Sequence, residues 1–558
     1  MNSLLNSHQK DICYQYPEKF KAIYKESYLE FAKVMDCFSE QNKDNLFWWI
    51  SSTASRSELQ SNLYRDFCSI KLVTILAKEN ILPSKILVRS DAIKKVLQQT
   101  PQFKKIVIHV SSKKYKVIER IRLIFQPIHF CFNKILQKQL IAVYFKESSN
   151  LNNKVIIENF ISYESIRDRY YPDLKRFLSN SDKEIIYMPT FINTNIFTTL
   201  SLIKKLKSSE STYLFKETHC SYQEIFQASF YKNYFQAFNF PLLNIELANS
   251  SFNLLPLFKE ALSLEKFSSL SAEGVLNYSL VKNLSKLHVR LDTVIDWWEN
   301  TAMDKGLNLG FHNFYSHSPV KGYMGFVPNQ FSFELAPSVT ERNSGVIPET
   351  IGVMGDIFLN TPRRIANEQK TVVAPALRFN HLFHDRQEKS NVNNATILVV
   401  LPAFIDQANE ILDTLLKFHS QLKDFYFIIK MHPACKINRK YFQSLSSNAT
   451  FDDQRPINEL IQDASLMITG ASSASIEAIM LNMPVLNICS TQLPFAELIP
   501  SNLRTNLFQE YRQKEDLFIQ IEELISLYEN KIEPSLNIND YFCKPTSKNV
   551  NLFFNSSR

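Results

Sequence analysis

The hydrophobic pattern of the chain changes along its length. Residues 1–43 mix charged and aromatic positions in a way that predicts helices. From residue 44 onward, short apolar runs alternate with longer segments of helical period, and this alternation predicts parallel sheets with crossover helices. The first series of predicted strands covers residues 45–52, 85–90, 105–111, 154–162, 184–192 and 212–217.

A second series of strands and helices begins near residue 395. It follows a stretch at residues 318–356 that carries glycine and proline and that we interpret as a domain junction. The predicted strands cover residues 395–404, 425–433, 448–453, 466–470 and 484–488, with predicted helices at 406–422 and 456–464. Two parallel-sheet domains in tandem are expected to bind a ligand between them, at the carboxyl ends of their strands.

The length of the chain, 558 residues, favours more than one domain. We predict an α/β protein with a helical N-terminal extension over residues 1–43 and a first Rossmann-like domain, with insertions and the junction, over residues 44–385. A second Rossmann-like domain is predicted over residues 386–535, and a C-terminal tail over residues 536–558.

Glycine is scarce, and its distribution excludes some classes of nucleotide-binding protein. All nine glycines lie between Gly274 and Gly470. The first 273 residues therefore contain no glycine-rich phosphate loop of the Walker or dinucleotide type. Eight cysteines are scattered singly with no CxxC pair, so the sequence supports neither a zinc site nor a disulfide framework. The first 20 residues lack the apolar core of a signal peptide, and we expect a cytoplasmic protein.

The formal net charge of +8 suits an anionic substrate or an anionic membrane surface. No nucleic-acid-binding signature accompanies it, so we expect no nucleic acid partner. The stretch from Lys113 to Lys146 has eight Lys or Arg and one Glu, interleaved with aliphatic and aromatic residues. Such a stretch either lies on an anionic membrane or forms core-facing helices with a solvated basic face. The sequence contains no apolar run of about 18 residues, so it predicts no membrane span.

A small, hydroxylated loop joins a predicted strand to a predicted helix in the second series. The free N–H groups at the start of a helix favour anions, and hydroxyl side chains add donors of their own. A carboxylate further along the same helix is suited to accept hydrogen bonds from the hydroxyls of a ribose. The alternative is that a serine simply caps the helix and the carboxylate is a first-turn charge. The candidate residues of this loop are Thr469, Gly470, Ser472, Ser473, Ser475 and Glu477.

A second group of candidates follows the strand at residues 425–433. Lys430, His432 and Pro433 lie at its carboxyl end. The hydroxylated loop at residues 469–475, which we call the serine loop, is expected on the same side of the sheet. Histidine and lysine side chains at this edge suit a phosphate. A single His-Pro pair is a weak signal, but its order and spacing with the later serine loop are more specific.

With these motifs, residues of about 395–490 resemble the nucleotide-binding domain of GT-B glycosyltransferases that use CMP- or CDP-activated donors. The families concerned are Kdo transferases, bacterial sialyltransferases and CDP-glycerol transferases, which carry a His-Pro motif and a later Ser-Ser motif. His432 and Pro433 match the first motif, and Ser472 and Ser473 match the second. The resemblance implies a GT-B fold, with two Rossmann-like domains facing a central cleft. It also implies that these residues hold the donor phosphate, with Glu477 near the ribose.

The first half of the chain resembles surface-polysaccharide transferases only loosely. The similar stretches are FWWISSTASRS at residues 47–57, DRYYPDL at residues 168–174 and DWWENTAMDKGL at residues 296–307. The acidic pair followed by glycine that is typical of sialyltransferases is absent from the glycine-free half.

No motif identifies the catalytic residue. Glycosyl transfer needs a general base or a carboxylate nucleophile, and in a two-domain enzyme we expect it at the carboxyl end of a strand of the first domain. For each acid, the alternative is a salt-bridged loop. The predicted catalytic candidates are Glu158, Asp168, Asp173 and Glu217. The predicted acceptor or donor contacts are Ser55, Arg56, Arg169, Glu349 and Arg378.

The sequence thus predicts a glycosyltransferase that moves a sugar, CMP-linked and Kdo-like, from a nucleotide-activated donor to a cell-surface glycan or a lipid-linked acceptor. No cofactor is expected, and no metal ion, because no Asp-x-Asp motif lies near the predicted loops. We expect a cytoplasmic location, peripheral on the inner membrane. The alternatives are a CDP-glycerol-type glycerophosphotransferase, a sialyltransferase and an inactive GT-B binding protein.

Overall fold

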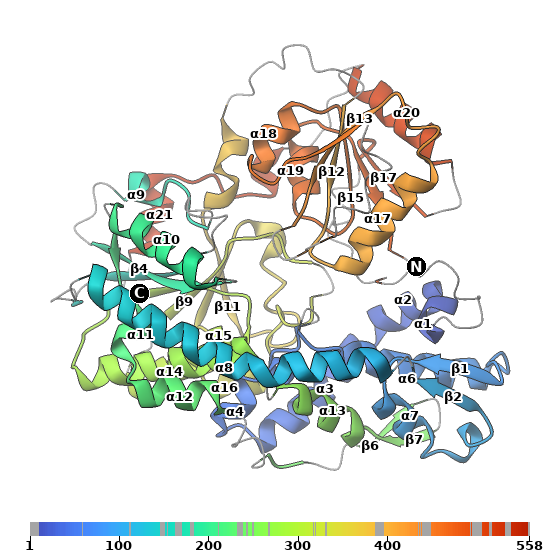
Figure 1. Cartoon of the computed structure of the whole chain (residues 1–558), viewed down its shortest axis with the longest axis horizontal. Helices are drawn as coiled ribbons and strands as arrows, with labels where there is room; N and C mark the ends of the chain where they lie inside the picture. Colours follow the sequence, from blue (N-terminus) through green and yellow to red (C-terminus); the bar gives the residue numbers. More distant parts are fainter. Residues whose placement is uncertain are drawn as a thin grey trace.

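The computed structural model describes residues 11–555 with gaps. The gaps are residues 58–59, 111–112, 146–150, 153, 162–169, 179–183, 193, 210, 232–237, 241–243, 248–249, 266–267, 316, 318–319, 330–331, 385–395, 433–434, 436, 438–447, 491–492, 494–504, 513–515 and 530–536. Figure 1 shows the second domain above a larger body that contains the first sheet and the N-terminal helices.

The first domain contains a seven-stranded, fully parallel sheet. Its strands are β3 (Val155–Ile161), β4 (Ile185–Phe191), β5 (Thr212–Tyr213), β8 (Thr293–Trp297), β9 (Val320–Met324), β10 (Thr350–Val353) and β11 (Lys370–Val373). The spatial order is β11-β10-β9-β8-β3-β4-β5. The chain therefore builds outward from β3 in one direction and then returns to β8 and builds outward in the other. This is the strand order of a doubly wound sheet.

The helices of the first domain join these strands or lie beside the sheet. They are α8 (Lys113–Tyr144), α9 (Leu174–Phe177), α10 (Ile196–Lys207), α11 (Lys216–His219), α12 (Tyr222–Ser229), α13 (Leu255–Glu265), α14 (Ser269–Lys286), α15 (Ala302–Phe314) and α16 (Val339–Asn343). A strand pair, β6 (Asn244–Leu247) with β7 (Ser250–Asn253), is antiparallel and separate from the main sheet. Two 3₁₀ segments, η4 (Asp356–Phe358) and η5 (Leu377–Phe383), lead toward the second domain.

The second domain repeats this topology in a six-stranded parallel sheet with the order β14-β13-β12-β15-β16-β17. The strands are β12 (Thr396–Val400), β13 (Tyr426–Lys430), β14 (Ala449–Phe451), β15 (Leu466–Thr469), β16 (Val485–Ile488) and β17 (Phe508–Tyr511). Its helices are α17 (Ile405–Lys417), α18 (Ile457–Gln462), α19 (Ala474–Met480) and α20 (Leu517–Glu529). The predicted strands of this half are all present, because continuous Val, Ile and Leu runs suit strands buried on both faces.

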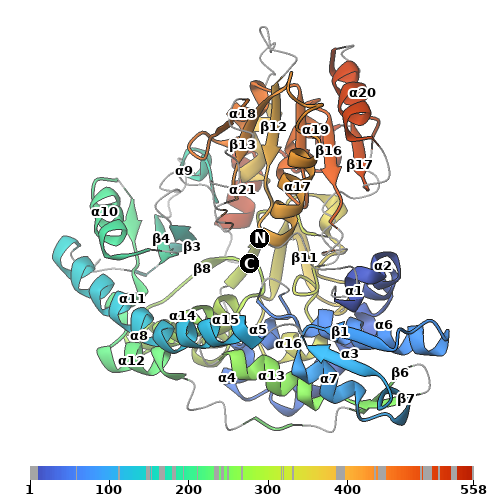
Figure 2. The same ribbon diagram turned by 45° about the vertical axis from the view of Figure 1, so that its right-hand side comes forward.

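The N-terminal part of the chain forms a helical body with its own core. Its helices are α1 (Ile12–Gln15), α2 (Pro17–Glu26), α3 (Tyr28–Gln41), α4 (Leu46–Trp49), α5 (Ser52–Ser55), α6 (Leu63–Lys78) and α7 (Asp91–Leu97). The short strands β1 (Lys85–Val88) and β2 (Val107–Val110) pair only with each other in the described structure. The core of this body also contacts Phe404 and Ala471, in loops of the second domain. The N-terminal helices therefore reach both domains, as Figure 2 shows.

One predicted strand is wrong. Residues 45–52 form α4 and the start of α5 instead. The Asn45 side chain accepts a hydrogen bond from the Phe47 N–H, and the Ser51 side chain accepts one from the Ala54 N–H. These two N-caps favour helical turns, and the turns bury both Trp48 and Trp49 completely. The apolar run signalled burial correctly, but the capping residues decided the conformation.

The C-terminal tail returns to the first domain. The helix α21 (Ser547–Phe554) buries Val550, Phe553 and Phe554 in a cluster of first-domain residues, and Figure 1 shows the C-terminus beside that sheet. The approach is close, because a Cβ atom on Gly355 would lie 1.9 Å from the carbonyl oxygen of Tyr541. Glycine at position 355 therefore lets the tail pass.

Buried ion pairs hold helices of different parts together. Glu341 on α16 accepts hydrogen bonds from Arg56, at the end of α5, and from Lys305 on α15. The exposed fractions of the Arg56, Glu341 and Lys305 residues are 5%, 2% and 0%. Burial alone would raise the pKa of Glu341, but the two cations hold this pKa below its ordinary value. No helix in the described part of the chain has the length and apolarity to cross a bilayer.

We predict that Glu341→Gln destabilises the protein strongly, because it leaves two buried cations sharing a neutral partner. Breaking a buried pair by removing one partner costs about 3–5 kcal/mol. The neighbouring substitution Arg342→Gln is the control, since Arg342 pairs with Glu368 on the surface. An exposed pair contributes at most about 1 kcal/mol. Melting temperatures of both variants test this, and equal losses would contradict it.

Candidate functional site

The strand orders of the two sheets each create one switch point. In the second sheet it lies between β12 and β15, and in the first sheet between β3 and β8. At a switch point the connections leave in opposite directions, and this opens a crevice at the carboxyl ends where ligands bind. The serine loop follows β15, and the segment from Trp298 to Asp304 follows β8. Both loops therefore start at switch points.

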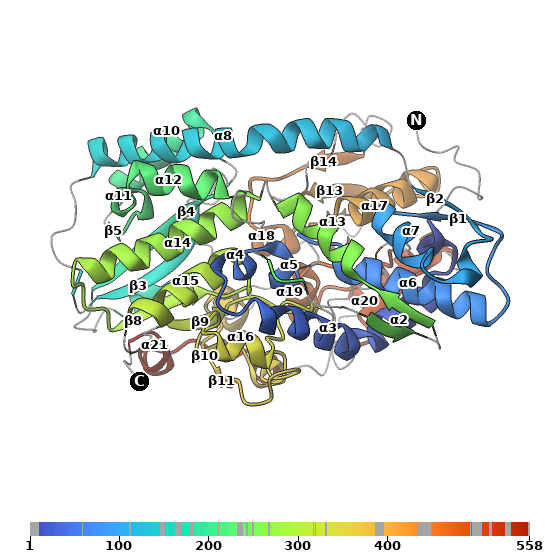
Figure 3. The ribbon, with the colours of Figure 1, turned by 90° about the horizontal axis from the view of Figure 1, so that it is seen from below.

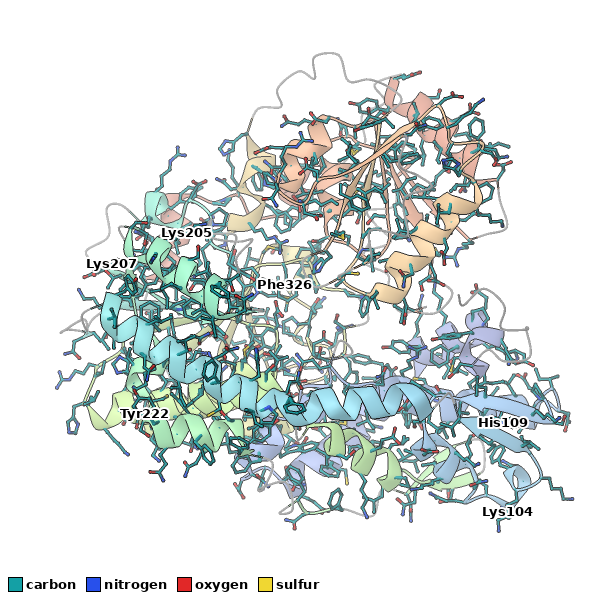
Figure 4. The ribbon with its side chains drawn as sticks, viewed as in Figure 1. Lys104, His109, Lys205, Lys207, Tyr222 and Phe326 are labelled. Carbon is teal, nitrogen blue, oxygen red and sulfur yellow. The ribbon has the colours of Figure 1, made fainter. Side chains whose placement is uncertain are left out.

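The two loops also belong to neighbouring parts of the molecule. Trp298, directly after β8, and Met324, at the end of β9, lie in one hydrophobic cluster with Ala474 and Ile476 of α19. Phe326 packs against this cluster and against the core of the first domain, and Figure 4 shows it between the two domains. The carboxyl ends of the first sheet are thus joined to the helix that follows the serine loop.

The serine loop is held in place by Gln407 of α17, a residue that the sequence did not single out. Gln407 on α17 is fully buried, and its Oε1 accepts a hydrogen bond of 3.1 Å from the N–H of Ala471. A Cβ atom on Gly470 would lie 2.5 Å from the Gln407 side chain. Glycine at position 470 therefore leaves room for this contact, and the contact fixes the loop.

The hydroxyl groups of the serine loop divide into inward and outward groups. Thr469 donates from Oγ1 to the Val400 carbonyl at 2.7 Å, and Ser475 donates from Oγ to the Ser472 carbonyl at 2.6 Å. Both residues are buried. Ser472 and Ser473 are partly exposed. Ser472 and Ser473 are therefore the two serines whose side chains have access to a ligand.

The turn after β13 places the His432 backbone firmly. The carbonyl of His432 accepts a hydrogen bond of 2.8 Å from the Cys435 N–H, and the Met431 N–H donates to Asp453 at 3.1 Å. His432 is partly buried, and Lys430 donates from Nζ to the Arg455 carbonyl at 2.6 Å. Pro433 lies outside the described residues.

The segment η5 connects predicted residues of both domains. Oε2 of Glu477 lies 3.2 Å from Nε2 of His381 on η5, and Asn380 donates from Nδ2 to Asp173 at 3.1 Å. Arg378, partly buried on the same segment, lies over the Phe379 ring. Glu477 is 4% exposed. Asp173, Arg378 and Glu477 thus meet at one interdomain segment, a grouping that the sequence did not reveal.

Glu158 lies at the first switch point, in a group of three buried carboxyls. Glu158 of β3, Asp296 of β8 and Asp304 of α15 have carboxylate oxygens within 4.8 Å of one another, a spacing that a metal site also shows. Burial raises the pKa of all three, and Asp304 and Glu158 raise that of Asp296 further. A carboxyl that keeps its proton can donate a hydrogen bond to its neighbour, which accounts for the close approach.

Glu299 is the exposed carboxylate of the loop that follows β8. The N–H groups of Glu299 and Thr301 both donate to Oδ2 of Asp304, at 2.9 and 2.8 Å, and Asn300 between them has a left-handed φ of 55°. Oε1 of Glu299 accepts a hydrogen bond of 2.9 Å from the Trp297 indole. The loop therefore presents the Glu299 side chain at the sheet edge in a fixed conformation.

Glu334 is a second acid of this region that the sequence did not indicate. Burial raises the pKa of Glu334 to about 7, while Arg56 and Arg364 lower it and Glu299 raises it further. Its backbone carbonyl accepts a hydrogen bond of 2.8 Å from Asn300. Glu334 therefore titrates in the neutral range, beside the Glu299 loop.

The remaining predicted residues lie elsewhere or serve the fold. Glu217 is fully buried and accepts a hydrogen bond of 2.7 Å from Lys134. Ser55 is fully buried and bonds to the Ser52 carbonyl at 2.8 Å. Arg56 is the partner of Glu341 described above. Glu349 is exposed directly before β10, at the amino end of the sheet and opposite to the switch point. Asp168 and Arg169 lie outside the described residues.

Among the functional residues that the sequence did not indicate, Glu299 alone has a signal in the sequence. Glu299 satisfies the rule used for the other acids, a carboxylate directly after a strand of the first domain. The strand β8 is not among the strands predicted from the sequence, so this position was not recognised. Gln407, His381 and Glu334 had no signal, because their contacts join elements distant in sequence.

No protein-family model matches the chain, and no curated protein matches it. Among solved structures, it is similar to a glycotransferase of kitacinnamycin, with 10% identity over 68% of this chain and 92% of that chain, and a TM-score of 0.37. The UDP-GlcNAc 2-epimerase of Methanocaldococcus jannaschii gives 12% identity, coverage of 71% and 97%, and a TM-score of 0.39. The UDP-GlcNAc 2-epimerase of Neisseria meningitidis, bound to UDP-GlcNAc, has 15% identity over 70% of this chain and 97% of that chain, and a TM-score of 0.39.

Likenesses this distant carry no argument about donor or reaction. The fold class follows from the chain itself, through two parallel sheets of Rossmann order and a hydrophobic cluster that joins their facing edges. This is the GT-B fold, preceded by a helical N-terminal extension. The predicted fold class is confirmed.

We predict that Asp296→Asn flattens the pH dependence of stability. A carboxyl whose pKa is raised on folding stabilises the protein fully below its unfolded pKa, about 3.9, and this contribution is lost as pH rises through the folded value. Asparagine keeps an oxygen for the Asn308 amide, which donates to Asp296 at 2.9 Å. The variant should therefore melt above the wild type at pH 8, with the difference shrinking toward pH 5.

The matched control is Asp413→Asn, at an exposed position on α17. Its melting temperature should follow that of the wild type at every pH. A lower melting temperature of Asp296→Asn at pH 8 would contradict proton sharing. It would indicate instead that the three carboxyls bind a cation, and melting with and without EDTA separates the two outcomes.

Proposed function

We propose that the protein is a glycosyltransferase that moves a sugar from a nucleotide-activated donor to a cell-surface glycan or a lipid-linked acceptor. The observation that supports this is the pairing of two switch-point loops on facing domains. One loop presents serine hydroxyls and follows a histidine-bearing turn. The other presents a carboxylate. A donor phosphate and an acceptor hydroxyl need these two kinds of group on opposite sides.

The donor is proposed to bind to the second domain. His432 and Pro433, with Lys430 beside them, and the partly exposed Ser472 and Ser473 would hold its phosphate. The resemblance to CMP-using families motivates a CMP-linked, Kdo-like donor, with sialic acid and CDP-glycerol as alternatives. Glu477 would lie near the ribose, where His381 at 3.2 Å orients it. No cofactor or metal ion is needed in this scheme.

Glu299 is proposed as the general base. It would take the proton of the acceptor hydroxyl as that oxygen attacks the anomeric carbon and the bond to the nucleotide phosphate breaks. Glu299 is exposed at the switch point, whereas Glu158 and Glu217 have no exposed surface to offer a substrate. Asp173 and Asp168 remain predicted alternatives. Arg169 and Arg378 remain predicted contacts for an anionic sugar or phosphate.

The acceptor side of the proposal includes a membrane. A lipid-linked glycan lies at a bilayer surface, so the enzyme would associate peripherally with the inner membrane on its cytoplasmic face. The sequence offers the stretch from Lys113 to Lys146 as a candidate for this contact, and its residues Lys113–Tyr144 form the long helix α8.

We predict that the protein binds CMP more tightly than UMP, GMP or AMP, and that EDTA leaves this binding unchanged. The His432 turn and the serine loop motivate the preference. Calorimetry with the four nucleotides measures it. Within the same titrations, His432→Ala and Ser473→Ala should each weaken CMP binding about tenfold to a hundredfold, since each removes a hydrogen bond to a charged group of about 1.5–3 kcal/mol.

The matched control for the histidine is His419→Ala, which follows α17 in the same domain. Its CMP affinity should equal that of the wild type. Tighter binding of UMP, or loss of CMP binding in EDTA, would contradict the proposed donor class. A large fall in the melting temperature of His432→Ala or Ser473→Ala would assign those residues to folding instead.

We predict that Glu299→Gln strongly slows transfer while donor binding persists. Loss of a general base slows the reaction by about a hundredfold or more. Release of nucleotide from CMP-Kdo, CMP-sialic acid and CDP-glycerol, with and without added glycan acceptors, measures transfer. Calorimetry with CMP measures binding. Glu368→Gln, at a side chain with 84% exposure, is the control. Full transfer by Glu299→Gln would return the role to Asp173 or Asp168.

A further inference from the structure

The helix α8 exposes an apolar stripe and buries a polar one. Its outward positions include Phe125, Ile128, Phe132 and Val143, with exposed fractions of 61%, 54%, 55% and 78%. Their spacing of three, four and eleven residues keeps them on one side of a helix. Figure 3 shows α8 along the outer edge of the molecule. The side chains of this apolar stripe are therefore exposed to solvent, whereas most large apolar side chains pack against other residues.

The two helices beside α8 continue this apolar surface. Both α10 and α12 pack against α8, and Figures 1 and 3 show α8 with α10 and α12 beside it. On α10, Ile196 and Phe197 are exposed by 42% and 83%, and on α12, Tyr222 and Phe226 by 52% and 57%. We call these eight residues on α8, α10 and α12 the three-helix face.

The concentration of exposed apolar residues is high on this face. The described part of the chain has eighteen large, exposed apolar side chains, and eight of them belong to these three helices. Single exposed apolar residues are normal, but contiguous groups of them mark a surface that binds a partner or a membrane.

The charges near the three-helix face are positive. Lys204, Lys205 and Lys207 are exposed in the last turn of α10, and Figure 4 shows Lys205 and Lys207 on one side of α8 with Tyr222 on the other. Lys207 lies 5.6 Å from the centre of the Phe145 ring. Residues 125–145 and 196–207 contain no Asp or Glu, and α12 contributes only Glu224.

The lysines in the described part of α8 face inward instead. Lys134 is 2% exposed and pairs with Glu217 and Glu273. Lys138 donates from Nζ to three carbonyls near the end of α11, at 2.8–3.0 Å. The basic face that the sequence predicted for α8 is therefore, in this part of the helix, a polar inner face. The exposed lysines come from α10, which follows later in the chain.

We propose that the three-helix face binds the surface of a bilayer that contains anionic lipids. Its Phe, Ile and Val side chains enter the boundary between headgroups and acyl chains, while Lys204 and Lys205 pair with anionic headgroups. Tyr222, with Lys138 5.5 Å from its ring centre, lies at the polar edge. An outward-facing helix edged by lysines suits a deformable bilayer better than a pocket on another protein.

This inference deepens the lipid-linked acceptor of the proposed function by naming the surface and the lipid. The biological role of the lipid binding rests on that function, but the binding itself requires neither donor nor acceptor. A protein that binds CMP but no vesicles would keep the donor proposal and lose this one. A protein that binds vesicles but no CMP would do the reverse.

The test is sedimentation of the full-length protein with vesicles of phosphatidylglycerol and phosphatidylcholine, and with vesicles of phosphatidylcholine alone, at low and high salt. The wild type should bind the anionic vesicles more tightly, and salt should weaken the binding because the Debye length falls from about 10 Å at 0.1 M to about 3 Å at 1 M. The double variant Phe132→Ser with Phe197→Ser should lose about tenfold or more in binding at both salt concentrations. Lys204→Gln with Lys205→Gln should lose binding at low salt only.

Matched controls come from the C-terminal tail. Leu552→Ser removes an apolar side chain with 68% exposure on α21, and Lys544→Gln with Lys548→Gln removes two exposed charges beside it. Both should bind vesicles as the wild type does. Equal losses in the controls, equal binding to neutral vesicles, or no binding by the wild type would overturn the proposal. A wild-type dimer that Phe132→Ser with Phe197→Ser makes monomeric would instead assign the face to a second copy of the chain.

Discussion

The geometry of parallel sheets governs the rest of this structure. In a parallel sheet the chain must return to the amino edge before each new strand, so every loop that follows a strand gathers at the carboxyl edge. In both domains the order then reverses beside the first strand, β3 or β12. The Glu299 loop and the serine loop are therefore brought to crevices by topology, although about 170 residues separate them in the chain.

The two domains are joined by elements that belong to neither sheet. The segment η5 contacts Asp173 on one side and Glu477 on the other. The tail crosses back to the first domain through the gap left by Gly355, and the N-terminal core reaches Phe404 and Ala471 beside the second switch point. Both ends of the chain therefore contribute to the packing between the parts of the molecule.

The distribution of polar and apolar groups on α8 follows from what lies beneath it. Glu217 and Glu273 are fully or nearly fully buried, and an uncompensated buried carboxylate is costly. Lys134 pairs with both of them and Lys216 pairs with Glu273 as well, so α8 turns a charged side inward and an aromatic side outward. The same logic applies to Glu341, whose two cations come from α5 and α15.

The sequence by itself determined the α/β class, the two-domain order and the strands of the second domain, because continuous apolar runs report burial directly. It also determined which loops carry Ser472, Ser473 and His432. The helical conformation of residues 45–52 follows from the local N-caps Asn45 and Ser51, which the strand prediction did not weigh. Only the tertiary structure decided that Gly470 contacts Gln407, that Lys134 faces inward and that Glu299 is the exposed acid at the switch point. Those outcomes depend on contacts between elements distant along the chain, and no local pattern records such contacts.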